Sequence, residues 1–218
     1  MVKVARNNRA AAARRQRPTR ESRLMSILYL VRHARPSAGW GDDPDPGLDA
    51  TGHEQAAAIA ATLDRRIASL PIWTSPLRRC RETAASLEQL WGRSALVVDI
   101  YAELPSPALH LKARHEWLRA GMAGTWEQLH RSAPAGSPDY LAWRRDLLAA
   151  LLAAHEDAVV YTHFLAINVA VGAALGRDDV LCFRPDHASM TCIDTTGGAL
   201  RVVELGREAH TGVLTGKA

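Results

Sequence analysis

Two histidines of this 218-residue chain each follow a short apolar run, and both could act on an anion. Arg32 and His33 come directly after one run, and His163 comes directly after another. A neutral imidazole is nucleophilic, and its ordinary pKa of about 6.5 leaves much of it neutral at cellular pH. Arginine keeps its charge and presents a planar fork that matches phosphate oxygens. These residue types favour phosphoryl transfer, which mainly needs positioning and neutralised charge, and the scheme requires no metal.

A third apolar run, residues 70–73, leads into Ser75 and Arg79. In an open α/β sheet, ligands bind beyond the carboxyl ends of the parallel strands. If the three runs are neighbouring strands, their ends bring the histidines and arginines to one edge of the sheet, where helix N-termini also begin. The sequence therefore predicts an anion pocket at this edge.

Short apolar runs alternate with longer amphipathic segments along the rest of the chain, a pattern typical of α/β proteins. The predicted strands are residues 25–31, 70–73, 95–99 and 158–162, with a closing hairpin of residues 190–194 and 200–205. The predicted helices are residues 51–69, 76–90, 139–155 and 164–175. Thr51 followed by Glu54 predicts a capping box at the start of the first helix. Because the strands are almost continuously apolar, we expect them to be covered on both faces, in a three-layer α/β/α sandwich with a mostly parallel central sheet.

Residues 105–138 break this alternation with four prolines, three histidines and two tryptophans. An excursion of this length between regular units most often covers a site. We therefore expect a small cap insertion over the strand ends, within a single domain of residues 25–210.

The net charge of +4 is unevenly distributed along the chain. Residues 1–24 hold eight Lys and Arg against one Glu, so the remainder carries a net charge of −3. A polyanion-binding surface is expected on the folded domain itself, so nucleic acid is not an expected partner except through this basic tail. We expect residues 1–24 to be a disordered extension, or to result from a start assigned upstream of Met25, and residues 211–218 to be frayed.

The composition, 47% hydrophobic and 23% charged, excludes collagenous, coiled-coil and wholly disordered chains. No apolar run approaches the roughly 18 residues of a membrane-spanning helix, so no membrane partner is expected. Three cysteines without a Cys-x-x-Cys spacing indicate neither a disulfide framework nor a zinc ribbon. We expect a cytoplasmic protein with no metal and no cofactor, whose oligomeric state the sequence leaves open.

Four segments, in order, resemble the motifs of the histidine phosphatase superfamily. Residues 30–35 (LVRHAR) are similar to its Arg-His-Gly signature, residues 48–56 (LDATGHEQA) to its Leu-Thr-x-x-Gly-x-x-Gln-Ala segment, and residues 74–84 (TSPLRRCRETA) to its Thr-Ser-Pro-Leu-x-Arg block. Residues 161–164 (YTHF) stand where the family has its second histidine. The resemblance extends over about residues 25–205 and points to the branch of phosphoglycerate mutases and small bacterial-type phosphatases.

The resemblance implies a role for each matched residue. His33 would attack phosphorus to form a phosphohistidine, which water then hydrolyses. The phosphoryl oxygens would be held by Arg32, Arg79 and His163. Glu103, which follows the third predicted strand where the family's acid commonly lies, would protonate the leaving oxygen.

Other residues are weaker candidates for the same site. Ser75 could contact phosphate or cap the helix that follows it. His187 precedes the final strands and is predicted to line the pocket mouth and bind substrate. Glu116 and Glu127 are rivals to Glu103 as the proton donor.

Departures from the family pattern bear on the reaction. Ala34 replaces the signature's glycine, Arg35 stands where a glutamate is common, and Asp49 stands where a threonine is usual. The mutases' longer asparagine-containing segment has no counterpart in residues 36–47. Because a mutase must retain its intermediate and exclude water, this difference favours hydrolysis of a phosphomonoester. Phosphoglycerate mutase activity is the alternative, and a non-catalytic phospho-ligand-binding or regulatory domain is a third interpretation; the substrate is left open.

Overall fold

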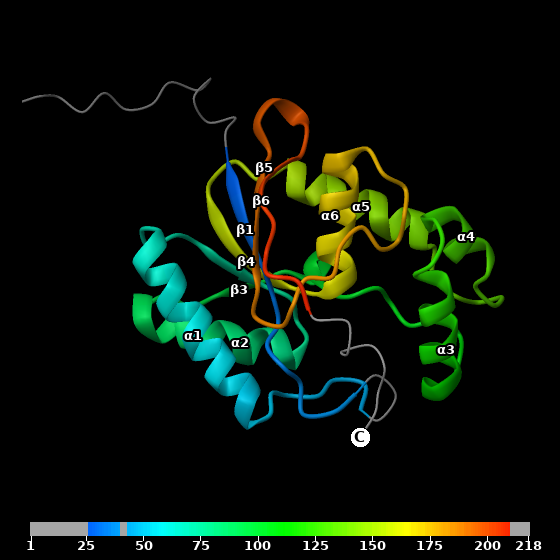
Figure 1. Ribbon diagram of the computed structural model, residues 1–218, viewed down its shortest axis with the longest axis horizontal. Helices are drawn as coiled ribbons and strands as arrows, with labels where there is room; N and C mark the ends of the chain where they lie inside the picture. The colour runs from blue at the N-terminus through cyan, green and yellow to red at the C-terminus, as the bar shows by residue number, and fades with distance from the viewer. Residues whose placement is uncertain (1–25, 40–42, 210–218) are drawn as a thin grey trace, which may run out of the picture.

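A six-stranded sheet forms the centre of the computed structural model, which describes residues 26–39 and 43–209 (Figure 1). Its strands are β1 (Ile27–Arg32), β2 (Ile72–Thr74), β3 (Leu96–Val97), β4 (Ala158–Thr162), β5 (Met190–Asp194) and β6 (Arg201–Glu204). They are ordered β3-β2-β4-β1-β5-β6, with β1 to β4 mutually parallel, and β5 antiparallel to both β1 and β6. The predicted basic tail and the predicted frayed C-terminal segment lie outside the described residues.

Before the polar residues that end them, Arg32 and Thr162, the two central strands β1 and β4 are apolar because their side chains alternate between two cores. Leu28 and Leu30 of β1 contact one core, and Val31 contacts the other. On β4, which pairs Val160 with Leu30, Val160 and Tyr161 divide between the cores in the same way. This alternation is what a strand buried on both faces requires.

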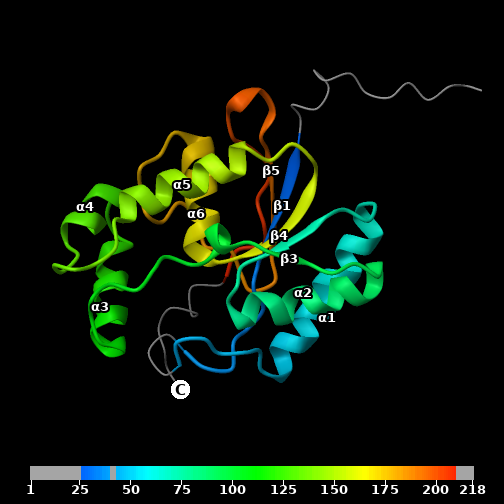
Figure 2. The same ribbon diagram turned by 180° about the vertical axis from the view of Figure 1, so that it is seen from behind.

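Helices cover both faces of the sheet (Figures 1 and 2). α1 (Ala50–Arg66) and α2 (Arg78–Trp91) pack together on one face, and α5 (Tyr140–Leu152) and α6 (Phe164–Leu175) lie on the other. Gly176, at φ 65°, ends α6 in the left-handed conformation that glycine adopts without strain. The predicted α/β/α sandwich is therefore confirmed. No helix within the described ranges is both long enough and apolar enough to cross a membrane.

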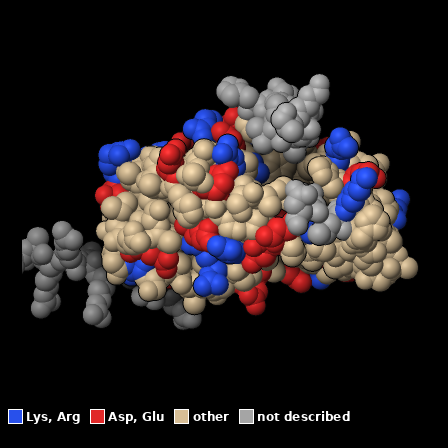
Figure 3. Space-filling model, turned by 90° about the horizontal axis from the view of Figure 1, so that it is seen from below, with Lys and Arg blue, Asp and Glu red and all other residues tan. Residues whose placement is uncertain are grey.

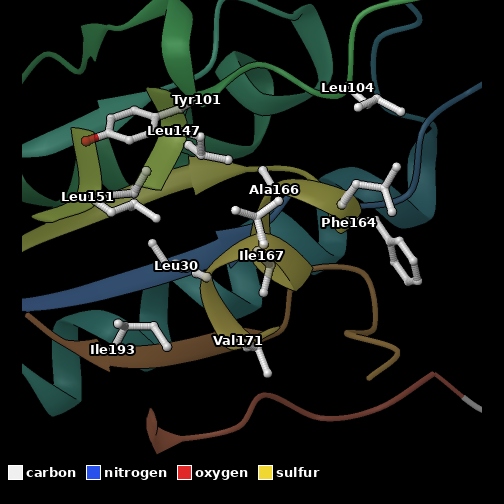
Figure 4. Close-up of a cluster of buried hydrophobic side chains, with 14 of the residues drawn as sticks. Leu30, Tyr101, Leu104, Leu147, Leu151, Phe164, Ala166, Ile167, Val171 and Ile193 are labelled. Atoms are coloured by element: carbon white, nitrogen blue, oxygen red, sulfur yellow. The ribbon is translucent and has the colours of Figure 1, made fainter. Parts of the chain in front are cut away.

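The larger core lies between the sheet and the α5–α6 layer. Figure 4 shows Leu30 and Ile193 of the sheet facing Ile167 of α6, with Leu147 and Leu151 of α5 alongside. All five side chains are at most 2% exposed. Full burial of each such side chain contributes about 1.5–3 kcal/mol of transfer free energy, so this core anchors β1, whose carboxyl end reaches the candidate site.

Two short helices, α3 (Leu111–Gly121) and α4 (Trp126–Arg131), form the predicted insertion. Both lie beyond α5 and α6, on the side away from α1 and α2 (Figures 1 and 2). Trp126 is 1% exposed and packs against Trp143 of α5, with ring centroids 5.8 Å apart. The backbone of Trp126 also donates a hydrogen bond to the chain that follows α6. The insertion therefore extends the α5–α6 layer sideways and is fixed to it by the contact between the buried Trp126 and the half-buried Trp143. That it covers the strand ends as a cap stays a prediction.

Two local expectations are wrong. The N-cap of α1 is Asp49, whose carboxylate accepts a hydrogen bond from Gly52 N at 2.7 Å, so the helix begins before Thr51, the predicted cap. β3 is only two residues long and lies at the sheet edge, with Leu96 62% and Val97 47% exposed. Its apolar sequence predicted cover on both faces, but β3 lies at the sheet edge, where it pairs only with β2 in the described part of the chain and both of its side chains are exposed.

Candidate active site

The carboxyl ends of β1, β2 and β4 meet at one edge of the sheet, as expected for neighbouring parallel strands. His33 N donates to the carbonyl oxygen of Thr162 at 3.0 Å, and Ser75 N donates to that of Tyr161 at 2.9 Å. These bonds extend the strand pairing beyond the strands themselves. They bring the rings of His33 and His163 to a centroid distance of 5.3 Å.

His33 is buried at the end of β1 and has a defined tautomer. Its Nδ1 lies 2.8 Å from the carbonyl oxygen of Ala34, which can only accept, so Nδ1 carries the proton and Nε2 keeps its lone pair. Burial, followed by the charge of Arg32, holds the pKa of His33 well below its ordinary value. His33 is therefore neutral near pH 7 and nucleophilic at Nε2.

Arg79, in the first turn of α2, is joined to His163. Its Nη2 lies 3.2 Å from His163 Nδ1, and because a guanidinium only donates, Nδ1 accepts and Nε2 carries the proton. That Nε2 donates to Ser75 Oγ at 2.7 Å, and Ser75 Oγ also accepts from Leu77 N just before α2. Burial, followed by the charge of Arg79, holds the pKa of His163 well below its ordinary value. His163 is thus a neutral ring that orients Arg79, and Ser75 supports both.

Arg32 is held by three groups. Nη1 donates to the carbonyl oxygen of Pro185 at 2.9 Å, and Nη2 donates to His187 Nε2 at 3.0 Å. Its guanidinium carbon lies 5.0 Å from the centre of the Phe164 ring, within cation–π range. Burial lowers the pKa of Arg32 to about 10, so it is still charged at neutral pH. The His187 ring lies 5.7 Å from that of His33, and burial, followed by the charge of Arg32, lowers the pKa of His187 to about 3.

Two charged nitrogens at this edge, Nε of Arg32 and Nε of Arg79, are buried without a hydrogen-bond partner among residues 26–39 and 43–209. Buried donors in folded proteins almost always have a partner. Arg32 and Arg79 both act electrostatically on the neutral His33, so two charged donors without a partner among the described residues make the surroundings of this ring a candidate binding site for an anion with several acceptor oxygens.

Glu103 follows the 3-10 helix Asp99–Tyr101 and is buried near the start of α6. Its Oε1 accepts from Leu104 N at 3.0 Å, and its Oε2 lies 3.5 Å from Leu165 N. Burial raises the pKa of Glu103, although the Leu104 bond and the charge of Arg79 oppose the shift. This carboxyl group keeps its proton to a higher pH than an exposed glutamate does, as a general acid requires.

The other candidates from the sequence do not share this setting. Glu116 on α3 and Glu127 on α4 are exposed, and Glu127 pairs with Arg131. Cys80, which was not among these candidates, does lie in the setting: its thiol is buried 3.3 Å from His163 Nε2, and burial raises its pKa, which favours the neutral thiol. In the described part of the chain, no three His, Cys, Asp or Glu side chains gather where they could hold a metal ion.

Two further residues at this edge were not predicted from the sequence. Thr83 Oγ1 accepts from Ala34 N at 3.0 Å and donates to the carbonyl oxygen of Arg79 at 2.6 Å, so it joins α2 to the turn after β1. Asp45 Oδ1 lies 3.8 Å from Arg79 Nη1. Thr83 could have been found, because it belongs to the matched block of residues 74–84. Asp45 lies in a loop without periodicity and gives no such signal.

Figure 3 views the molecule from the side on which these strands end. Lys and Arg side chains are interspersed with Asp and Glu over this face, and neither sign covers it continuously. The part of this face that is not drawn in grey therefore carries no continuous basic patch, and the arginines of the site, Arg32 and Arg79, are buried beneath the surface.

Fold and side-chain arrangement together define an α/β protein with two buried histidines and two buried arginines at the carboxyl ends of its parallel strands. The family model of the histidine phosphatase superfamily (branch 1) matches residues 28–208. The chain belongs to this family.

Solved structures of related fold include a mycobacterial glucosyl-3-phosphoglycerate phosphatase, with 21% identity, a TM-score of 0.65 and coverage of 85% of this chain and 100% of that one. A phosphoserine phosphatase from Entamoeba histolytica, in complex with 3-phosphoglyceric acid, has 17% identity, a TM-score of 0.65 and coverage of 85% and 98%. A protein from Thermus thermophilus has 24% identity, a TM-score of 0.61 and coverage of 83% and 99%. At these identities the likeness shows the fold. No curated protein sequence matches this chain.

Proposed function

We propose that this protein hydrolyses a small phosphomonoester through a phosphohistidine formed on His33, without a metal ion. The observation that carries the proposal is the juxtaposition of two buried Nε–H donors, on Arg32 and Arg79, with a neutral histidine whose Nε2 lone pair is available. Neither donor has a partner in the described ranges. Such a pocket binds a phosphoryl dianion and places a nucleophile beside it.

The reaction follows from the protons that these groups hold. Nε2 of His33 attacks phosphorus, the bond from phosphorus to the ester oxygen breaks, and Glu103 gives its proton to that oxygen. A water molecule then attacks the phosphohistidine, Glu103 takes a proton from it, and the phosphorus–nitrogen bond breaks. One ester and one water yield an alcohol and inorganic phosphate, with His33 neutral and Glu103 protonated again.

The groups around His33 stabilise the charged species that form during this reaction. Attack through Nε2 makes the ring of His33 cationic while the phosphoryl group stays on it, and the carbonyl oxygen of Ala34 on Nδ1–H stabilises that cation. Arg32 and Arg79 neutralise charge on the phosphoryl oxygens, and His163 keeps Arg79 in place. These contributions are electrostatic and positional, the two that phosphoryl transfer mainly needs.

Membership of the histidine phosphatase superfamily supports a phosphatase. The names of the mycobacterial and Entamoeba proteins, a glucosyl-3-phosphoglycerate phosphatase and a phosphoserine phosphatase, point the same way. Both names refer to small phosphorylated molecules. We therefore propose a small phosphomonoester as the substrate class.

The test is phosphate release from a generic aryl phosphate in buffer that contains a chelator. The matched control is His155→Ala, because His155 is exposed and precedes β4, at the opposite end of that strand from His163. We expect wild type and His155→Ala to release phosphate and His33→Ala to lose on the order of a thousandfold. Full activity of His33→Ala would overturn the proposal. Conversion of 3-phosphoglycerate to 2-phosphoglycerate without phosphate release would indicate a mutase instead.

A further inference from the structure

The turn before β5, residues 185–189, contains a residue with a strained backbone conformation. Ala188 has φ 50°, the one non-glycine residue with positive φ in the part of the chain that the structure describes, and it is buried. A residue with a Cβ atom is disfavoured in the left-handed region and stays there only where surrounding contacts determine its conformation. The shape of this turn is therefore imposed by what it touches.

The turn contacts the backbone of Arg32 and of the candidate nucleophile, His33. Ala188 N donates to the carbonyl oxygen of Arg32 at 3.1 Å and lies 3.4 Å from that of His33. Arg32 N donates in return to the carbonyl oxygen of Ser189 at 3.1 Å. The turn is thus attached by backbone hydrogen bonds to Arg32, which ends β1, and to His33, which follows it.

The same turn supplies both acceptors for the Arg32 side chain, the Pro185 carbonyl oxygen for Nη1 and His187 Nε2 for Nη2. The backbone of His187 is held in turn, because His187 N donates to Asp186 Oδ1 at 2.8 Å. Asp186 Oδ2 accepts from Arg207 Nε at 2.9 Å. A chain of contacts therefore runs from Arg207 through the turn to Arg32.

His187 can serve as an acceptor only if its ring is neutral. The charged groups that act on it are Arg32 and Asp186, followed by Arg35 and Asp49 with smaller effects. Burial, followed by the charge of Arg32, outweighs the carboxylates and lowers the pKa of His187 to about 3. The ring therefore accepts from Arg32 across the physiological pH range.

We propose that His187 is a positioning residue for Arg32, and that it acts on substrate through that guanidinium rather than by touching it. The turn fixes Nη1 and Nη2, and the Phe164 ring covers the guanidinium at 5.0 Å. These two bonds use two of the five guanidinium N–H groups, so the Nε–H, which is buried without a partner among the described residues, and the second N–H of each Nη remain for the phosphoryl group. This inference rests on the proposed function in one respect only, that Arg32 binds a phosphate oxygen.

Two substitutions at His187 separate positioning from substrate contact. His187→Leu fills the space but removes the acceptor, whereas the side-chain amide oxygen of His187→Gln can accept from Arg32. The readouts are the dissociation constant of inorganic phosphate by calorimetry, the KM and kcat of an aryl phosphate, and the melting temperature. We expect His187→Leu to weaken phosphate binding and raise KM on the order of tenfold, and His187→Gln to stay within roughly threefold of wild type.

A double-mutant cycle with Arg32→Ala shows through which group His187 acts. If His187 works through Arg32, adding His187→Leu to Arg32→Ala changes phosphate affinity by less than about twofold. A full additional loss in that background would mean that the ring contacts the anion itself and would overturn the inference. The inference would also be wrong if His187→Leu binds phosphate like wild type, or if the Gln and Leu variants lose affinity equally while both stay folded.

The binding measurement also separates this inference from the proposed function, because phosphate binding needs no turnover. A wild-type protein that binds phosphate but hydrolyses nothing would contradict the proposed function and leave the cycle interpretable. A wild-type protein that does not bind phosphate would overturn the role of Arg32 and, with it, that of His187.

Discussion

His33 donates its Nδ1 proton to the carbonyl oxygen of Ala34 at 2.8 Å, so the candidate nucleophile is oriented by the residue that follows it. That orientation depends on a fixed backbone at Ala34. Thr83, on the neighbouring α2, accepts from Ala34 N at 3.0 Å and provides the fixation.

Replacing Thr83 by Val removes this acceptor and leaves the buried Ala34 N–H without its partner. We expect the free energy of unfolding to fall by about 1–3 kcal/mol, since an unpaired buried donor costs its desolvation, and kcat to fall as His33 loses its orientation. Thr62→Val is the control, because Thr62 Oγ1 on α1, like Thr83 Oγ1, donates to the carbonyl oxygen four residues before it, that of Ala58, but at an exposed position. Urea unfolding of both variants checks the expectation, and equal losses would contradict it.

Glu103→Gln tests the proton donor. An alkyl phosphate has a poor leaving group, so we expect its kcat to fall by about 10²–10⁴, whereas an aryl phosphate that leaves without protonation should lose far less. Glu127→Gln, at an exposed position on α4, should behave like wild type. Equal losses for the two esters would show that Glu103 does not protonate the leaving oxygen.

The pH dependence of the wild-type kcat follows from the direction in which the pKa of Glu103 is shifted. Burial raises the pKa of Glu103, and the group acts as an acid only while protonated. The kcat for an alkyl phosphate should therefore fall as pH rises through that raised pKa. The fall should be absent from the profile of Glu103→Gln, and its persistence there would assign it to another group.

Stability should decrease below neutral pH because neutral histidines are held in the fold. The pKa values of His33 and His163 lie well below the ordinary value, and that of His187 lies at about 3. An unfolded chain binds protons at these residues below pH 6.5 and the folded chain does not, so stability present at higher pH is lost on acidification. We expect a loss of about 1 kcal/mol per histidine between pH 6.5 and 5.5. Denaturant unfolding of His187→Gln should show a smaller loss than wild type, and an unchanged pH slope would count against this explanation.

Asp45 brings a negative charge near the proposed phosphate ligand Arg79, at 3.8 Å. A bound phosphate must share Arg79 with this carboxylate, so Asp45→Asn should tighten phosphate binding by roughly two- to fivefold at low salt. The gain should shrink in high salt, and Asp146→Asn, at an exposed position on α5, should show none. Weaker binding by Asp45→Asn would mean instead that Asp45 supports Arg79.

The position of the site could be predicted from the sequence because one rule applies to all parallel strands. Each apolar run ends at a polar residue, and the carboxyl ends of neighbouring strands meet. His33, His163 and Arg79 are brought together on that basis. Which histidine accepts from which arginine was not predictable, because it depends on side-chain directions that no spacing encodes. The pairing of His187 with Arg32 comes from a strained turn whose contacts are far apart in sequence.

The start of α1 shows a second limit of sequence reasoning. Asp49 and Thr51 are both good N-caps, and local preference does not choose between them. The choice is made by tertiary packing, because a Cβ atom at Gly52 would lie 2.1 Å from the carbonyl oxygen of Arg35. Glycine lets the first turn of α1 approach the chain after β1 this closely, and Asp49 then caps Gly52 N.

The central claim is that His33 becomes covalently phosphorylated. Wild type, His33→Ala and His155→Ala should be mixed briefly with an aryl phosphate in buffer with a chelator, quenched under alkaline denaturing conditions and weighed by mass spectrometry. We predict a transient gain of about 80 Da, one phosphoryl group, in wild type and His155→Ala but not in His33→Ala, together with phosphate release. The same gain in His33→Ala, or sustained phosphate release by that variant, would contradict the claim.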